Sequence, residues 1–291
     1  MKAIRVAARL GAGLALLFAA CVPPEPDPFP RRHEPDTYMA VVQDAGTLRI
    51  GIPEDSAPIG YVDETGAPQG LAVELGRFVA RALHVRPDFR AYPSERLLGL
   101  VAIGGLDLGF PVTPLTEELV RNHRVTDPYL VAHQRLLVPA ASAWDGVDDL
   151  SGVRTCSYTE PRAGVELVEL NPDVIVEPAP DPMECGARFR RGRVDAVTAP
   201  DFYLLSIVRG LGRGAPSARD AHLTGDDLNT AGYAAAVIPV SGFAEFVRLV
   251  FEDAESDGRW RRAFEKTVGP PPPSPPALTL EEAAALWPIP R

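Results

Sequence analysis

The feature that most constrains the fold is an alternation of strand-like and helix-like segments along the chain. Residues 47–53 form an apolar run that ends at a proline, as a strand does, and residues 71–83 place apolar side chains on one helical face. A strand at 86–92, a helix at 94–104 and a strand at 106–110 follow. This order predicts an α/β fold, in which crossover helices connect the strands of a mostly parallel sheet.

The alternation restarts further along the chain and predicts a second α/β unit. Its expected strands are 133–139, 153–158, 173–178, 194–200 and 230–239, and its expected helices are 161–170, 181–191 and 201–209. Two amphipathic helices are expected at 243–256 and 258–266. After a polyproline spacer, we expect one short helix within 277–291 that docks through Leu286 and Trp287.

Composition limits the function classes. The chain has 291 residues, of which 46% are hydrophobic and 23% charged, so it is long enough for two domains with a sizeable core. The net charge of −10 argues against nucleic acid as a partner, because phosphate contacts need a basic face. No apolar run reaches about 18 residues, the length of a membrane span.

The first 21 residues carry an export pattern. Three basic residues precede an apolar stretch that is too short for a spanning helix and ends at Cys21. The small residues before Cys21 resemble the bacterial lipobox, in which the cysteine is diacylated and becomes the mature N-terminus. We therefore expect a signal peptide at 1–20, a lipid-anchored proline-rich linker at 21–39, and an extracytoplasmic protein at the outer face of the cell membrane. The alternative is an ordinary signal peptide with a chance cysteine.

The chain has two further cysteines, Cys156 and Cys185. A pair of cysteines in an exported protein favours one disulfide, and two free buried thiols are the alternative. Two cysteines without a cluster of histidines do not make a zinc site, so we expect no metal and no cofactor.

Short motifs follow one another in a characteristic order. They are L-R-I-G-I-P at 48–53, Y-V-D-E-T-G-x-x-x-G-L-x-V-E-L at 61–75, G-x-L-D-L at 104–108, T-D-P-Y-L at 126–130, D-L-S-G-V at 149–153, G-R-V-D-A-V at 192–197 and D-G-R-W-R-R-A-F-E-K at 257–266. Each motif is weak alone, whereas the series in this order is specific. Over residues 45–269 the chain resembles the extracytoplasmic solute-binding proteins of ABC importers, family 3, the polar amino-acid binders, and among them the actinobacterial glutamate-binding type.

The resemblance implies a two-lobed periplasmic-binding-protein-like fold of type 2. Each lobe would hold a mostly parallel sheet flanked by helices, and two crossing strands near Val125–Tyr129 and Thr230–Tyr233 would form the hinge. The implied parts are lobe 1 at 40–126 plus 231–269, lobe 2 at 127–230, and a proline-rich C-terminal tail at 270–291. The family also carries a lobe-2 disulfide where Cys156 and Cys185 stand.

Both charged anchors of the family's amino-acid clamp are substituted here. A lobe-1 arginine grips the ligand's α-carboxylate with a planar fork, but ungapped counting puts Leu119 at that position. Nearby Arg121 would face elsewhere on a helix. Pro200 stands at the lobe-2 aspartate position, and the next residue, Asp201, either takes over that contact or caps the following helix. Ala72 replaces a frequent aspartate of the family.

The remaining candidate contacts are cleft walls and rims: Ile59, Tyr61, Arg96, Thr113, Thr116, Tyr158 and Thr159. Arg96 stands where binders of acidic ligands carry an arginine, and the alternative is a solvated helix residue. Tyr158 and Thr159 follow a lobe-2 strand, where backbone N–H groups at a helix start can receive an anion. For Ile59 and Tyr61, core packing is the alternative to a ligand wall.

We expect a monomeric binding protein, not an enzyme. It would capture a small polar solute between its lobes and deliver it to the permease and ATPase subunits of an ABC importer, because the chain has no phosphate-binding loop of its own. Two alternatives stay open: a ligand-sensing or structural lipoprotein with a degenerate cleft, and a dehydratase-like enzyme of the same fold. The motifs leave the identity of the solute open.

Overall fold

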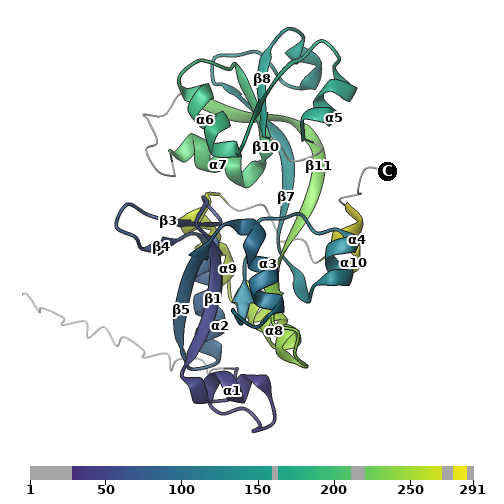
Figure 1. Cartoon of the computed structure of the whole chain (residues 1–291). Helices are drawn as coiled ribbons and strands as arrows, with labels where there is room; N and C mark the ends of the chain where they lie inside the picture. Colours follow the sequence, from purple (N-terminus) through teal and green to yellow (C-terminus); the bar gives the residue numbers. More distant parts are fainter. Residues whose placement is uncertain (1–27, 159–162, 211–219, 271–277, 287–291) are drawn as a thin grey trace, which may run out of the picture.

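The computed structural model of the chain describes residues 28–158, 163–210, 220–270 and 278–286, and these form two lobes (Figure 1). Two long antiparallel strands, β7 (Val125–Pro139) and β11 (Ala221–Val237), run from one lobe into the other. This is the two-lobed α/β fold expected from the sequence. The residue boundaries given above for the lobes stay predictions.

A mixed sheet of eight strands continues through both lobes, in the order β5-β1-β6-β11-β7-β10-β8-β9. In lobe 1, β1 pairs in parallel with β5 and β6, and in lobe 2, β8 pairs in parallel with β9 and β10. The antiparallel pair of β7 and β11 joins the two parallel parts. The other bounds are β1 (Thr47–Pro53), β5 (Arg86–Tyr92), β6 (Leu108–Gly109), β8 (Arg154–Tyr158), β9 (Ile175–Ala179) and β10 (Ala196–Pro200).

A separate small sheet of three strands lies at the edge of lobe 1 that is nearer to lobe 2, and its hairpin extends to the side (Figure 1). Its strands are β2 (Asp55–Ser56), β3 (Gly60–Val62) and β4 (Pro68–Gln69). The turn between β3 and β4 is the one that the D-E-T-G motif predicts, and the Asp63 carboxylate holds it by accepting hydrogen bonds from the backbone N–H groups of Thr65 and Ala67.

Helices cover the sheets. They are α1 (Tyr38–Ala45), α2 (Leu71–Ala82), α3 (Ser94–Ala102), α4 (Glu117–Asn122), a 3₁₀ turn (Val147–Leu150), α5 (Ala163–Leu170), α6 (Pro182–Arg190), α7 (Asp201–Arg209), α8 (Phe243–Ser256), α9 (Arg259–Thr267) and α10 (Leu280–Leu286). The periodicity of α2 buries Leu71, Leu75 and Val79 completely, and the helix packs against β1, β5, α8 and α9. Within the described residues, no helix combines the length and apolar character needed to cross a membrane.

The hinge strands are longer than predicted. The expected strands near Val125–Tyr129 and at 133–139 are one strand, β7, and β11 begins at Ala221 instead of Thr230. A proline inside a strand normally argues against it, but Pro128 lies opposite Ala234, where β-bulges shift the register. Residues 221–229 lack the apolar alternation that predicts a strand, and they join β11 because residues 221–224 and Asn229 pair with β7, with a register shift between them.

Both ends of the described chain add helices to lobe 1. Helix α1 was not predicted; Thr37 caps its start, and Gly46 ends it in the left-handed region at φ 68°. Helix α10 was predicted, but its docking residues were partly wrong. Leu286 is 36% exposed, whereas Ala283 and Ala284 are buried, and Trp287 lies outside the described residues.

Candidate functional site

A cavity of about 770 Å³ lies between the lobes. Lobe 1 lines it with the segment from Glu54 to Ala57 and with Tyr61 and Val62, which belong to β2, β3 and the chain around them. Lobe 2 lines it with residues of α6 and its N-cap, and with Tyr203 of α7. The cavity therefore changes shape whenever the hinge strands bend, as a ligand-closing cleft requires.

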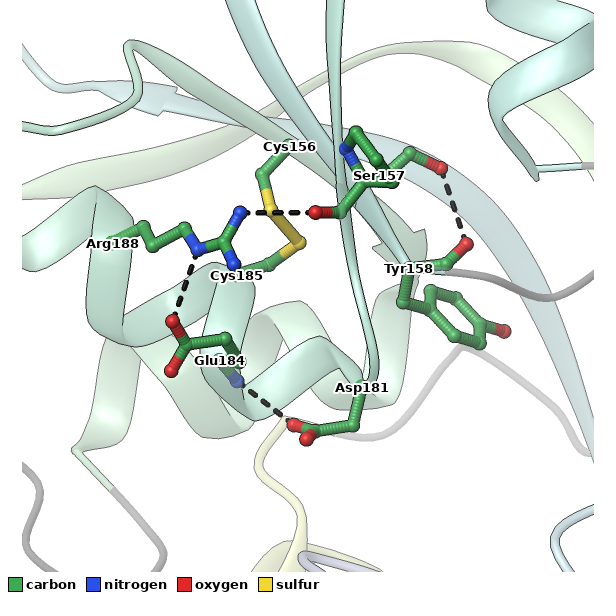
Figure 2. Close-up of a disulfide and its surroundings, with 8 residues drawn as sticks. Cys156, Ser157, Tyr158, Asp181, Glu184, Cys185 and Arg188 are labelled. Atoms are coloured by element: carbon green, nitrogen blue, oxygen red, sulfur yellow. Dashed lines mark hydrogen bonds and ion pairs between the residues drawn. A yellow bond between two sulfur atoms is a disulfide. The ribbon is translucent and has the colours of Figure 1, made fainter.

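The lobe-2 wall is held rigidly by the disulfide (Figure 2). Cys156 in β8 and Cys185 in α6 are bonded, with Cα atoms 5.5 Å apart, so the predicted pair is confirmed. The Asp181 carboxylate caps α6 by accepting from the Glu184 backbone N–H at 2.8 Å. Arg188 pairs with Glu184 at 3.0 Å and donates to the Pro178 carbonyl, also at 3.0 Å. These contacts fix the helix that faces the cavity.

Of the predicted contacts, one tyrosine belongs to the described lining of this cavity, whereas Tyr158 and Asp201 do not. Tyr61 of β3 lines the cavity directly. Tyr158, at the end of β8, is half-buried and packs edge to face with Tyr203, with ring centroids 6.3 Å apart. Asp201 is the first residue of α7, and its carboxylate accepts from the Phe202 backbone N–H at 2.7 Å. Pro200 occupies the cap position that the alternative had given to Asp201.

Other predicted contacts lie away from this cavity. Ile59 is completely buried in the core of lobe 1, which is the core-packing alternative. The Thr116 hydroxyl caps α4 by accepting from the Leu119 N–H at 3.0 Å, and Thr113 is a half-buried residue of the segment before it. The exposed Arg96 guanidinium lies over the Tyr92 ring, 5.9 Å from its centroid. Thr159 and Cys21 fall outside the described residues.

Leu119, at the position of the family's carboxylate-binding arginine, also has apolar surroundings in the structure. Leu119 on α4 packs against a buried cluster that includes Leu115 and Ala283. Arg121 points to solvent and pairs with Glu117 at 3.3 Å, with 66% of its side chain exposed. Neither residue offers a buried charge to a solute.

Sequence reasoning missed the arginines at the end of α6. Arg190 and Arg191 both line the cavity, and the Arg190 Nε is buried without a hydrogen-bond partner. Burial and the neighbouring Arg191 both lower the pKa of Arg190. The helical pattern of α6 gave no signal for them, because basic residues are common in the last turn of a helix.

The floor of the hinge carries a buried hydroxyl. Tyr129 of β7 is fully enclosed, and its hydroxyl has no hydrogen-bond partner among the described residues. Burial raises the pKa of Tyr129, and the nearby Tyr203 raises it further. A buried tyrosine with a raised pKa stays neutral near pH 7 and contributes packing at this place. Among the described residues, no group of three or more His, Cys, Asp or Glu side chains is arranged to hold a metal ion.

Comparisons with known proteins agree with this geometry. The family model "Bacterial extracellular solute-binding proteins, family 3" matches residues 48–269. The ABC transporter glutamine-binding protein GlnH of Bacillus subtilis (strain 168) is 21% identical over 274 residues, covering 92% of this chain and 98% of that protein.

Solved structures share the fold. The "Ancestral Cationic Amino Acid Solute Binding Protein (AncCDT-1)" superposes with a TM-score of 0.70 at 18% identity, covering 80% of this chain and 100% of that one. The cysteine-binding protein from Campylobacter jejuni has a TM-score of 0.61 at 19% identity, covering 84% of this chain and 97% of that one.

Proposed function

The chain belongs to family 3 of the bacterial extracellular solute-binding proteins, and we propose that it captures a small polar, amino-acid-like solute between its lobes for an ABC permease. The observation that carries the proposal is the cavity lined by both lobes, which are joined by two strands able to act as a hinge. Each wall carries charged side chains and one tyrosine beside apolar residues, a lining suited to a small solute that has both charged and apolar groups.

The relatives support an amino acid as the solute class. GlnH is named for glutamine, and the two solved structures are named for cationic amino acids and for cysteine. These amino acids differ in their side chains but share the α-amino and α-carboxylate groups. We therefore propose only that the solute of this chain carries such an amine and carboxylate. A permease and an ATPase would be supplied by partner subunits.

We also propose that Cys21 anchors the protein to the outer face of the membrane through lipid, with the proline-rich residues after it as a spacer. The lipobox-like residues before Cys21 support this. The variant Cys21→Ala should move the protein from the membrane fraction into the soluble fraction, and unchanged membrane retention would contradict the anchor.

One alternative has an observation in its favour. Leu119 and Pro200 leave the family's clamp without charge, which is what a sensing or structural lipoprotein with a degenerate cleft would show. An enzymatic role has less support: a structure of AncCDT-1 is described as a precursor of cyclohexadienyl dehydratase, but the relatives named above are binding proteins.

The test is a thermal-shift screen of the purified chain against amino acids, amines and organic acids. A solute at 100 times its dissociation constant should raise the free energy of unfolding by about 2.7 kcal/mol. The control is the same screen on Tyr61→Ala, which removes a cavity wall, and it should show smaller shifts for the same solutes. A screen in which no solute stabilises the chain would favour the degenerate cleft.

A further inference from the structure

The charges around the cavity are divided between its two walls. The lobe-1 wall carries Glu54 and Asp55, both exposed, while the lobe-2 wall carries Arg190 and Arg191. Two further carboxylates line the lobe-2 wall, but both are engaged within α6: Asp181 caps the helix and Glu184 pairs with Arg188. The two arginines are therefore left without a neutralising carboxylate from their own helix.

Arg190 is the less satisfied of the two. Its Nε is buried and has no acceptor among the described residues, and its NH1 makes one long contact, 3.5 Å, to the Ile207 carbonyl. No ion pair joins Arg190 or Arg191 to a described carboxylate, whereas Arg188, two residues before Arg190 in α6, has two good partners. A guanidinium that is partly removed from water without an anion beside it is costly, and an anionic ligand group relieves that cost.

The clamp position and the nearby arginines that the family resemblance pointed to are not among the described lining residues of this cavity. Leu119 packs into an apolar cluster, Arg121 pairs with Glu117 at the surface, and Arg96 lies against Tyr92. Among the described residues that line the cavity, the cationic side chains are those of Arg190, the last residue of α6, and Arg191, which follows it.

We propose that Arg190, assisted by Arg191, binds the carboxylate of the solute on the lobe-2 wall, and that the solute's amine faces Glu54 and Asp55 on the lobe-1 wall. This inference rests on the proposed function, because it assigns an orientation to a solute in that same cleft. A planar guanidinium matches a carboxylate with two parallel N–H···O bonds, which fixes the orientation as well as the affinity. The lobe that holds the carboxylate is then opposite to the one implied by the family's clamp.

The test is calorimetry on the wild-type chain and three variants: Arg190→Gln, Arg191→Gln and the matched control Arg193→Gln, which removes an exposed charge just after α6 and outside the described cavity lining. The probes are L-glutamine, L-cysteine and L-arginine, with L-argininamide as an analogue of arginine that keeps its amine and side chain but lacks the carboxylate. Arg190→Gln should weaken binding of the amino acid that binds wild type by about 10- to 100-fold, because it removes a charge-assisted contact.

Arg191→Gln should have a smaller effect, since Arg191 is exposed, and Arg193→Gln should change the dissociation constant by less than about threefold. Arg190→Lys, which keeps the charge without the fork, should fall between wild type and Arg190→Gln and shows whether any loss is more than misfolding. If arginine binds, argininamide should bind the wild-type chain weakly. Its dissociation constant should be about the same for wild type and for Arg190→Gln.

The outcomes separate the two levels of the proposal. An amino acid that binds wild type and Arg190→Gln equally well would overturn the assignment of Arg190 while leaving the cleft as a solute site. If no probe binds wild type and the screen of amines and organic acids also fails, the proposed function falls and this inference falls with it.

Discussion

At the scale of single residues, one buried carboxylate explains why the G-x-L-D-L motif has an aspartate. Asp107 is 3% exposed, and its oxygens accept from the Arg49 backbone N–H at 2.7 Å, from the Arg49 guanidinium and from the Tyr38 hydroxyl at 2.8 Å. It thereby ties the loop before β6 to strand β1 and to helix α1. A buried carboxylate with this many donors is satisfied, which a buried charge must be.

The contacts among Asp107, Arg49 and Tyr38 predict that the stability of the protein decreases at alkaline pH. Burial and Asp107 raise the pKa of Tyr38 to about 12, above the value of about 10 expected for the unfolded chain. The unfolded chain therefore loses this proton first, so the stabilisation is fully present below about pH 10 and is lost as pH rises from about 10 toward 12. We expect Tyr38→Phe to lower the free energy of unfolding by about 1–2 kcal/mol at pH 8.

The measurement is urea unfolding of wild type and Tyr38→Phe at several pH values between about 8 and 11.5. The gap between the two proteins should narrow in the upper part of this range, because only wild type has the hydroxyl that titrates. A gap that stays constant to the highest pH would contradict the hydrogen bond to Asp107.

At the scale of elements, α10 fastens the C-terminal tail onto the hinge. It packs against α4, β7 and β11, on the opposite side of the hinge strands from the β3–β4 turn (Figure 1). Its start is capped by Thr279, whose hydroxyl and backbone N–H contact the Glu282 carboxylate, and its Leu280 N–H donates to Asp127 Oδ1 of β7 at 3.0 Å. Asp127 belongs to the T-D-P-Y-L motif, so this motif connects the hinge to the tail.

Gly232 of β11 offers a direct test of that docking. A Cβ at this position would lie 2.9 Å from the Ala283 Cβ and 3.3 Å from the Leu115 Cδ1, which is too close without movement. We expect Gly232→Ala to cost about 1–2 kcal/mol in the full chain, as overpacking does, and clearly less in a chain that ends at residue 276. Urea unfolding of the four combinations measures the coupling, and equal costs in the long and short chains would show that α10 does not pack on Gly232.

Elements with a strong apolar periodicity were predicted correctly from the sequence. Elements that depend on contacts with distant parts of the chain were missed. Helices α2, α8 and α9 lie within a few residues of their predicted ranges because each buries its own apolar face. The start of β11 and helix α1 were missed, since residues 221–224 pair with β7 without an apolar alternation of their own and Tyr38 is held by a contact to Asp107, 69 residues away. The candidate site shows the same division: Tyr61 was found through its motif, whereas Arg190 became visible only when α6 faced the other lobe.

At the scale of the whole molecule, the hinge strands join two lobes that share aromatic contacts across the hinge. Phe202 of α7 meets Tyr233 of β11 edge to face, with centroids 5.4 Å apart, and Phe110 of lobe 1 meets Tyr129 of β7 at 5.6 Å. The indole N–H of Trp260 donates to the Tyr129 carbonyl at 3.0 Å and ties α9 to the base of the same strand. The lobes can thus move about the two strands while the packing at the base of the hinge stays in place.

The central claim is that a solute closes the two lobes on each other, and the distance between them tests it most directly. Spin labels at Glu64→Cys, on the β3–β4 turn, and Arg193→Cys, after α6, report this distance by pulsed electron resonance in a chain with Cys21→Ser. Both sites are exposed, and the native disulfide leaves Cys156 and Cys185 unreactive. With the solute that stabilises the chain most in the thermal screen, we predict a shorter distance that reverts when the solute is removed. In Arg190→Gln the same shortening should require about 10- to 100-fold more solute. A distance that stays the same at saturating solute would contradict closure of the cleft.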